Sequence, residues 1–322
     1  MALTPTGRVA GIDCGTNSIR LLIADVDASG RLRDVHREMR IVRLGEGVDA
    51  TGRFAPAALE RTRVALTDYA ELMAAQGVSR LRMVATSATR DAANRDEFFA
   101  MTAQVLGRVV AGAVAEVITG EQEAQLTFRG AVGELDAAEG PFVVVDLGGG
   151  STEVVLGDPV AGVSAGFSAD VGCVRITERC LHSDPPTAPE IAAARAVVRE
   201  LLAEALAAVP VQHARTWVGV AGTMTTLSAL ALDLDEYDSA AIHLSRITLS
   251  ELTALCDRLI AMTRAQRAAL GPMHPGRVDV IGGGAIVVQE LARFLADRAG
   301  IDELVVSEHD ILDGIALSIT AR

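Results

Sequence analysis

The sequence has 322 residues, half of them hydrophobic, which is enough for about two domains with buried cores. Its formal net charge is −13, and this acidic balance argues against a nucleic-acid partner, because nucleic-acid-binding domains usually carry a basic surface. All 29 basic residues are arginines, so catalysis or phosphate binding by a lysine side chain is excluded.

The first half of the chain alternates predicted strands and helices. The segment VAGIDCGTNSIRLLIADVD, residues 9–27, has two apolar runs around an Asp-x-Gly turn and predicts a β-hairpin. Apolar residues recur at helical spacing in residues 55–77, and Asn94 with Glu97 predicts the start of another helix. The other predicted elements are strands at residues 39–44, 81–87 and 115–120, and helices at residues 95–107 and 121–135. Such alternation is typical of an α/β fold.

The second half opens with another hairpin pattern, FVVVDLGGGSTEVVLGDP, at residues 142–159. A helix is predicted at residues 191–208. Residues 216–232 and 277–296 each read as a strand, a glycine turn and a helix, an order that can present a helix N-terminus to an anion. Residues 302–319 predict a last strand, a polar turn and a short helix.

The two hairpin patterns match each other position by position. When Asp13 is aligned with Asp146, each of Gly15, Ser18 and Arg20 of the first hairpin meets a counterpart in the second. These counterparts are Gly148, Ser151 and Glu153. We interpret the match as an internal duplication and expect two domains. The predicted boundaries are residues 1–130 for the first domain and 131–307 for the second, with a C-terminal helix at about 308–322 packed back on the first.

The turns suggest phosphate binding. Glycines permit positive φ angles and close approach of a ligand to the backbone, and successive N–H groups can form an anion-binding nest. A tight hairpin alone would also explain the glycines, but two copies in register with Ser and Thr hydroxyls favour phosphate. The predicted phosphate-binding residues are Thr16, Asn17, Ser18, Gly148, Gly149, Gly150, Ser151 and Thr152, with Gly222 and Thr223 from a third glycine turn.

Four cysteines are scattered without a CxxC pair, which favours reduced thiols, and the N-terminus lacks a signal-peptide pattern. No apolar run reaches transmembrane length, so we expect a cytoplasmic protein without a membrane partner. Cys14 is expected to be a packed small residue rather than a nucleophile. The pair His309–Asp310 is not expected to bind a metal, because the six histidines are dispersed along the sequence.

Seven motifs together resemble a known family. They are GIDCGTNSIRLLI, VATSATRDAANRDEF, EVITGEQEAQLTFRGA, VVVDLGGGSTEVVLG, VGCVRITER, AGTMTTLSA and SEHDILDG, and they span nearly the whole chain. The chain resembles the exopolyphosphatase/guanosine pentaphosphate phosphatase family of the actin-like ATPase superfamily. This resemblance implies an α/β fold of two actin-like (ribonuclease H-like) domains, with mixed sheets flanked by helices and the active site in the interdomain cleft. It also implies Mg²⁺ as the cofactor and a homodimer.

The resemblance further implies roles for single residues. Glu123 corresponds to the catalytic acid of the family and is the expected general base, whereas its neighbour Gln122 departs from the family's acidic residue. Arg90 is expected to act with it in catalysis, and Arg20 to bind phosphate. The expected metal ligands are Asp146, Glu153 and Asp13.

The leading hypothesis is a hydrolase that releases orthophosphate from the end of inorganic polyphosphate. Short chains are the expected substrate, because the sequence lacks the C-terminal helical domains of larger family members. One alternative is hydrolysis of the 5′-phosphate of guanosine pentaphosphate, or an ATPase or kinase activity of the same superfamily. Another is a non-catalytic sensor that binds ppGpp or polyphosphate.

Overall fold

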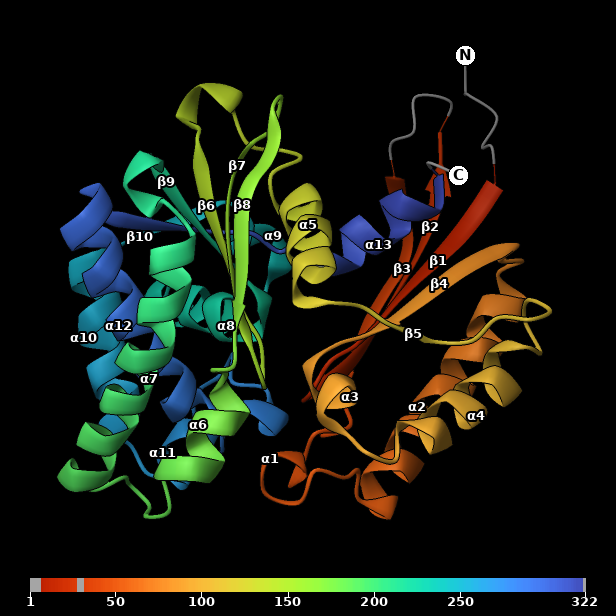
Figure 1. Ribbon diagram of the computed structural model, residues 1–322, viewed down its shortest axis with the longest axis horizontal. Coiled ribbons are helices and arrows are strands. Elements are labelled where there is room, and N and C mark those ends of the chain that lie inside the picture. The colour runs from red at the N-terminus through yellow and green to blue at the C-terminus, as the bar shows by residue number, and fades with distance from the viewer. Residues whose placement is uncertain (1–6, 28–31, 321–322) are drawn as a thin grey trace. The chain divides into compact units, whose positions relative to one another are not determined.

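The structure is a computed structural model that describes residues 7–27 and 32–320, except for the side chain of Thr320. Its contacts group into two compact units. The first unit contains Met1–Gly130 and Ile311–Arg322, and the second contains Ala131–Asp310. Each unit is built around a sheet of its own (Figure 1).

The first unit contains a five-stranded mixed sheet in the order β3-β2-β1-β4-β5. Strands β1, β2 and β3 pair antiparallel, whereas β4 and β5 continue the sheet in parallel. The strands are β1 (Gly7–Cys14), β2 (Ser18–Val26), β3 (Leu32–Ile41), β4 (Arg80–Ala85) and β5 (Glu116–Val117). The helices are α1 (Val48–Thr51), α2 (Pro56–Ala75), α3 (Ser87–Asp91), α4 (Arg95–Leu106), α5 (Gly120–Ala131) and α13 (Ile311–Thr320).

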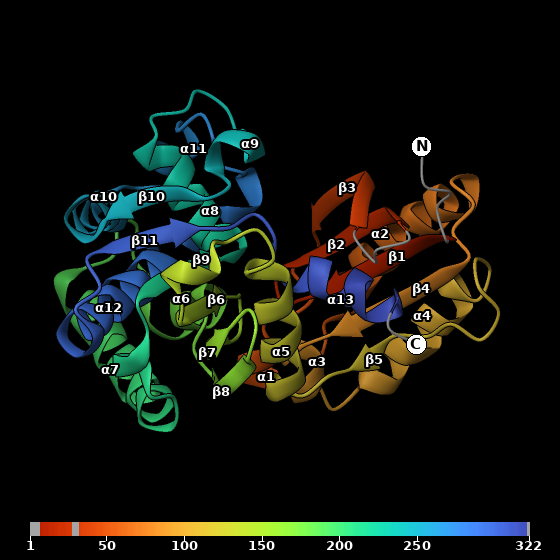
Figure 2. The same ribbon diagram turned by 90° about the horizontal axis from the view of Figure 1, so that it is seen from above.

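Both faces of this sheet are covered, which explains why its strands read as nearly continuous apolar runs. Alternate residues of β2, such as Leu21, face the core shared with α2 and α4, whereas Leu22 faces α13. The C-terminal helix α13 packs on β1, β2 and β4, as both ribbon views show (Figure 2). Gly11 permits this packing, because a Cβ there would lie 3.2 Å from the backbone nitrogen of Ala316.

The second unit contains a six-stranded mixed sheet in the order β10-β11-β9-β6-β7-β8. Its strands are β6 (Phe142–Leu147), β7 (Thr152–Asp158), β8 (Gly162–Ala169), β9 (Thr216–Val220), β10 (Ser245–Thr248) and β11 (Glu303–Val306). Its helices are α6 (Cys173–Cys180), α7 (Ala188–Ala208), α8 (Ala221–Ala231), α9 (Ser239–Ile242), α10 (Leu249–Ala261), α11 (Arg264–Ala268) and α12 (Ile281–Ala299). One large core, which includes the fully buried Trp217, joins the sheet to these helices.

The two sheets share one topology. In each, three consecutive antiparallel strands are followed by two parallel strands on the side of the first strand, and β10 adds an antiparallel edge in the second unit. This repeat confirms the predicted fold class: an α/β protein with two mixed, actin-like (ribonuclease H-like) sheets flanked by helices. The predicted hairpins at residues 9–27 and 142–159 are confirmed as β1–β2 and β6–β7.

Three local predictions were wrong. The segment 277–281 is not a strand, because residues 275–277 form a 3-10 helix and α12 follows at once. The strand predicted at 39–44 lies earlier, at Leu32–Ile41. The helix start predicted at Asn94 is confirmed, because α4 begins at the next residue, but the predicted side-chain cap is wrong. Asn94 Oδ1 instead accepts a hydrogen bond from Phe54 N–H (2.8 Å) and thus fixes a distant segment.

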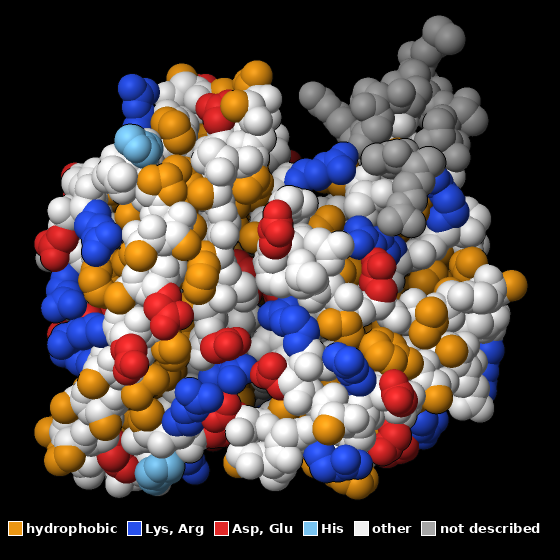
Figure 3. All heavy atoms as spheres, in the orientation of Figure 1, with side chains coloured by type: hydrophobic (Ala, Val, Ile, Leu, Met, Phe, Trp, Pro, Cys, Tyr) orange, Lys and Arg blue, Asp and Glu red, His pale blue; other side chains and the backbone are white. Residues whose placement is uncertain are grey.

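Acidic and basic side chains are intermixed on the face of the molecule shown in Figure 3. The surface also has exposed ion pairs such as Arg63–Glu60. Exposed pairs of this kind contribute little to stability. Within residues 7–27 and 32–320, no helix is long and apolar enough to cross a membrane.

Candidate active site

The turns of the two hairpins are closed by equivalent hydrogen bonds. Gly15 N–H donates to the Ser18 carbonyl at 2.9 Å, and Gly148 N–H donates to the Ser151 carbonyl at 3.0 Å. The residues before these turns, Asp13 and Asp146, end β1 and β6 at matching positions. The correspondence expected from the sequence therefore extends to the hydrogen bonds of the backbone.

Positive φ, one of the two reasons predicted for the glycines of these turns, does not apply to them. Among the described residues with positive φ, neither Gly15 nor Gly148 is found. Close packing instead explains a neighbouring glycine, because a Cβ on Gly172 would lie 2.4 Å from the carbonyl carbon of Gly149. Gly172 therefore lets the start of α6 pack directly on the loop.

This packing orients the amides of the second turn. The N–H groups of Cys173 and Val174 donate to the carbonyls of Gly148 (3.0 Å) and Gly149 (2.9 Å). In a trans peptide the next N–H points opposite to the carbonyl. The two following amides therefore point away from α6, in the arrangement an anion nest requires. Arg175 adds two more contacts, because its backbone N–H donates to the Gly149 carbonyl at 3.1 Å and its Nε donates to the Gly150 carbonyl at 2.8 Å.

The first turn is held in the same way by a different segment. Gly45 N–H donates to the Thr16 carbonyl (2.8 Å), and the N–H groups of Val42 and Arg43 donate to the Asn17 carbonyl (3.0 and 2.9 Å). The amide of Asn17 and the amide after it therefore point away from these donors. The sequence analysis included both supporting segments, as the motif VGCVRITER and the strand predicted at 39–44, but it did not predict that they pack on the turns.

The second hairpin brings two carboxylates together. Asp146 and Glu153 are directly opposite each other in the β6–β7 pair, and their residues are 6% and 1% exposed. Residues opposite each other in an antiparallel pair project to the same face, and like charges there are unfavourable. Ser168 Oγ donates to Glu153 Oε1 at 2.7 Å and orients that carboxylate. Carboxylate oxygens are the ligands that Mg²⁺ prefers, so this pair fits the predicted cation.

The first hairpin has an internal ion pair at the same position. Asp13 is opposite Arg20, whose Nε and Nη2 both donate to Asp13 Oδ2, at 3.0 and 2.7 Å. One oxygen of the carboxylate is thus bound to a guanidinium. The roles of Asp13 as a metal ligand and of Arg20 as a phosphate ligand stay predictions. In this arrangement each side chain would have to bind its ligand while it also contacts the other.

Glu123 and Arg90 also form an ion pair within the first unit. Glu123 is in the first turn of α5 and is 6% exposed, and Arg90 Nη1 donates to its Oε2 at 2.8 Å. The same nitrogen contacts the Ile118 carbonyl at 3.0 Å, which fixes the guanidinium. Gln122 forms a capping box with Thr119, so the residue that departs from the family motif helps to start the helix.

The hydroxyl of Thr152 is used inside the fold. Its Oγ1 donates to the Val171 carbonyl at 2.5 Å, and the side chain is fully buried. The predicted contact of Thr152 with phosphate therefore does not come from this proton. Cys14 is 1% exposed, which confirms a packed residue, and burial raises the pKa of its thiol well above the ordinary value.

The third glycine turn, between β9 and α8, contains Ala221 with a φ of 71°, an uncommon conformation for a non-glycine residue. Thr223 is 5% exposed and packs against Gly284 of α12. Arg277 is next to this turn: a Cβ on Gly222 would lie 2.6 Å from its guanidinium carbon, and its Nη1 donates to Thr226 Oγ1 at 2.8 Å. No motif or periodic pattern pointed to Arg277, so it was not predicted as a site residue.

The chain belongs to the Ppx/GppA phosphatase family, whose family model matches residues 22–319. It is 70% identical over 322 residues to Exopolyphosphatase 2 of Mycobacterium tuberculosis (strain ATCC 25618 / H37Rv), and the match covers 99% of each chain. A crystal structure of an exopolyphosphatase-like protein is 45% identical, with a TM-score of 0.91 and 97% of both chains covered. The Aquifex aeolicus Ppx/GppA protein is 32% identical, with a TM-score of 0.79 and 98% of both chains covered.

Proposed function

We propose that the protein is an exopolyphosphatase, which releases terminal orthophosphate from inorganic polyphosphate. The observation that carries the proposal is the 70% identity over the full chain with a relative named Exopolyphosphatase 2. The buried acid–arginine pair of Glu123 and Arg90 and the paired carboxylates of β6–β7 supply groups that such a reaction needs. Short chains are the proposed substrate.

Glu123 is the proposed general base. Its carboxylate takes a proton from water while the water oxygen attacks the terminal phosphorus, and the bond from that phosphorus to the bridging oxygen breaks. The shortened chain leaves with the electron pair of that bond. Arg90 holds the carboxylate of Glu123 in one orientation through the 2.8 Å contact. General bases of this kind contribute roughly 10²–10⁴-fold to the rate.

Asp146 and Glu153 are the proposed ligands of Mg²⁺, because their facing carboxylates match its preference for oxygen. When bound, the cation supplies positive charge that offsets the charge of the phosphate oxygens during the transfer. Ser168 keeps Glu153 in position for this role. Asp13 is proposed as a weaker ligand because Arg20 already contacts its carboxylate.

The glycine turns are the proposed phosphate cradle. The outward amides of the two hairpin turns supply donors, and Arg20 supplies charge next to the first turn. The full set of proposed phosphate ligands is Thr16, Asn17, Ser18, Arg20, Gly148, Gly149, Gly150, Ser151, Thr152, Gly222 and Thr223, to which we add Arg277. A site in a cleft between the domains, a homodimer and a cytoplasmic location stay predictions.

The proposal is tested by assaying orthophosphate release from short polyphosphate, long polyphosphate, guanosine pentaphosphate and ATP side by side, with and without Mg²⁺. We expect the fastest release from short polyphosphate and none without the cation. Preferred hydrolysis of guanosine pentaphosphate would move the assignment to the other named activity of the family. Tight binding of polyphosphate without any release would favour the non-catalytic sensor.

A further inference from the structure

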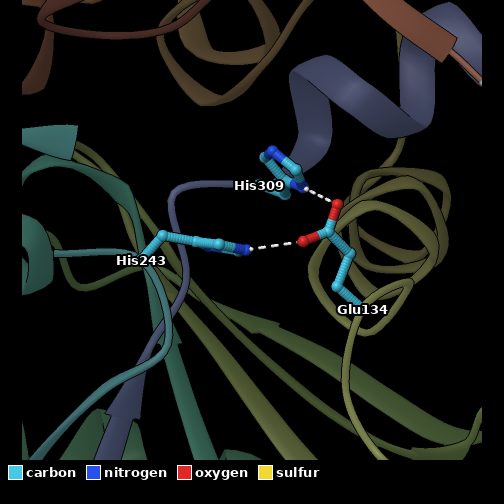
Figure 4. A group of neighbouring side chains, drawn as sticks. All are labelled: Glu134, His243 and His309. Atoms are coloured by element: carbon cyan, nitrogen blue, oxygen red, sulfur yellow. Dashed lines mark hydrogen bonds and ion pairs between the residues drawn. The ribbon is translucent and has the colours of Figure 1, made fainter. Parts of the chain in front are cut away.

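Glu134, His243 and His309 form a cluster that the sequence analysis missed (Figure 4). His243 Nε2 lies 3.1 Å from Glu134 Oε2, and His309 Nδ1 lies 3.8 Å from Glu134 Oε1. The two imidazole rings pack on each other with their centroids 4.6 Å apart. The dispersal of the histidines along the sequence does not prevent this cluster, because folding brings together residues that are far apart in sequence.

We propose that Glu134, His243 and His309 bind a divalent transition-metal ion of the Zn²⁺ class. One ligand atom from each residue lies within 4.8 Å of the other two, and Figure 4 shows both rings turned toward the carboxylate. Two imidazoles and one carboxylate suit Zn²⁺, Cu²⁺ or Ni²⁺, whereas Mg²⁺ prefers oxygen ligands. The site is therefore selective against the cation proposed for Asp146 and Glu153.

The carboxylate of the cluster can adjust its position, whereas the backbone at the two histidines is anchored by hydrogen bonds. The Glu134 side chain is 59% exposed, so its carboxylate can move by the small distance that closes the ligand set. His243 is fixed from behind: Leu244, the next residue, donates its N–H to the Val306 carbonyl at 2.7 Å. His309 is held by Ser307, whose Oγ donates to the His309 carbonyl at 2.9 Å. One mobile and two fixed ligands permit the ion to enter and to be held.

One hydrogen bond opposes the ion and also provides a way to detect it. Glu308 N–H donates to His243 Nδ1 at 3.2 Å, which leaves the ring proton on Nε2, toward Glu134. An ion bound at Nε2 displaces that proton, and the neutral ring then carries its proton on Nδ1, so the bond from Glu308 is lost. Metal–imidazole bonding outweighs one long hydrogen bond, but we expect a weaker site than one with ideal outer partners.

The position of the cluster suggests what the ion does. The chain passes from the first unit to the second after Gly130, and back to the first after Asp310. Glu134 and His309 therefore lie within a few residues of the two crossing points. A bound ion ties both connecting segments to the loop that contains His243. The expected effect is slower amide hydrogen exchange in residues 131–135 and at residues 307, 309 and 310, whereas the amide of Glu308 loses its bond to His243 and is not protected.

Calorimetric titration of tag-free protein with Zn²⁺, and separately with Mg²⁺, tests the proposal. We expect one Zn²⁺ per chain, and an affinity at least about tenfold weaker in each of Glu134→Gln, His243→Gln and His309→Gln. His213→Gln, at an exposed histidine outside the cluster, and Cys180→Ser, at a partly exposed thiol, are matched controls that should bind as the unchanged protein does. Thermal unfolding without metal checks that every variant folds.

A second measurement uses Glu308. Its backbone amide resonance should shift on addition of Zn²⁺ to the unchanged protein and should stay in place in His309→Gln at the same Zn²⁺ concentration. Absence of Zn²⁺ binding by the unchanged protein would overturn the proposal and leave a hydrogen-bonded cluster. Equal binding by the unchanged protein and all three cluster variants would also overturn it. Neither readout depends on polyphosphate hydrolysis.

Discussion

The two hairpins share the same strand pairing and turn hydrogen bonds but differ in local charge. In β1–β2 the facing pair is Asp13 and Arg20, whose ion pair is neutral overall. In β6–β7 the facing pair is Asp146 and Glu153, two buried carboxylates. Two facing carboxylates are a ligand set that suits a cation, whereas Arg20 neutralises the carboxylate of Asp13.

The proposed function gives the two hairpins one shared role and one separate role. The turns repeat the same hydrogen bonds and direct their amides outward, which suits both to bind phosphate oxygens. In the proposed function, the facing side chains then determine which hairpin binds a metal. The far ends differ too: Asp25 is buried between Arg8 and Arg33, whereas the matching Asp158 caps a turn.

The largest expected effect comes from a residue outside both hairpins. Glu123→Gln should lower the rate of orthophosphate release by roughly 10²–10⁴-fold, because the amide cannot accept a proton from water. Both hairpins are unchanged in this variant, so its affinity for divalent cation should stay the same. Steady-state kinetics and calorimetry measure the two quantities. Glu121→Gln, in the same first turn of α5, is the control; normal turnover in Glu123→Gln would remove the base assignment.

Substitutions in the two hairpins should differ in their effect on the Mg²⁺ concentration that activity requires. Asp146→Asn should raise the Mg²⁺ concentration for half-maximal activity by about tenfold or more, since it removes one of two carboxylate ligands. Asp13→Asn should change it much less, because Arg20 already neutralises that carboxylate. Activity titrated with Mg²⁺ at saturating polyphosphate measures this. A larger shift in Asp13→Asn than in Asp146→Asn would reverse the comparison.

Substitution of glycines at or next to the turns should have a smaller effect, which is on the free energy of unfolding. Gly172→Ala places a Cβ 2.4 Å from the backbone of the second turn and should cost about 1–3 kcal/mol of unfolding free energy. In the first turn, a Cβ on Gly15 would meet its nearest atom, the Ser18 carbonyl oxygen, at 3.7 Å. Gly15→Ala should therefore change stability by less than about 1 kcal/mol. Urea unfolding measures both, and equal losses would contradict the distinct packing of the turns.

The smallest expected effect comes from a substitution at the far end of the first hairpin. It is a loss of stability that depends on pH. Hydrogen bonds from Arg8 hold the pKa of Asp25 below its ordinary value, despite its burial. A carboxyl with a depressed pKa stabilises the fold above its unfolded pKa of about 3.9, and this contribution is lost as the pH falls through the folded-state pKa. Asp25→Asn should therefore destabilise the protein near pH 7 and less below about pH 3.

The control for this pH dependence is Asp158→Asn. Asp158 accepts hydrogen bonds from Val160 N–H and Ala161 N–H, at 2.8 and 3.0 Å. Asparagine forms the same type of turn. This variant should therefore unfold much as the unchanged protein does at both pH values. Denaturant unfolding at each pH measures the difference, and a pH-independent loss in Asp25→Asn would contradict the ion-pair explanation.

Much of this fold could be predicted from sequence because its central strands are buried on both faces. Continuous apolar runs around Asp-x-Gly turns identified β1–β2 and β6–β7. Strand β8 was missed because its residues, GVSAGFSA, are mostly small and give no strong alternation. The segment at 277–281 was mistaken for a strand because RVDVI has strand-like composition, although Pro275 and Gly276 start a 3-10 helix just before it.

The site was predicted less completely than the fold. Sequence motifs identified Glu123 and Arg90, and the structure adds that the two are paired. No motif could show that Arg20 pairs with Asp13, that Arg277 lies against Gly222, or that Thr152 directs its hydroxyl to Val171. These contacts depend on which segments pack against each turn, and local sequence patterns do not contain that information.

Direct measurement of cation binding tests the comparison of the hairpins most sharply. Mn²⁺ can replace Mg²⁺ at carboxylate sites and can be followed by electron paramagnetic resonance. Asp146→Asn should weaken Mn²⁺ binding by about tenfold or more, and Asp13→Asn should leave it nearly unchanged. Equal weakening in both variants, or unchanged binding in Asp146→Asn, would show that the facing carboxylates of β6–β7 are not the metal site.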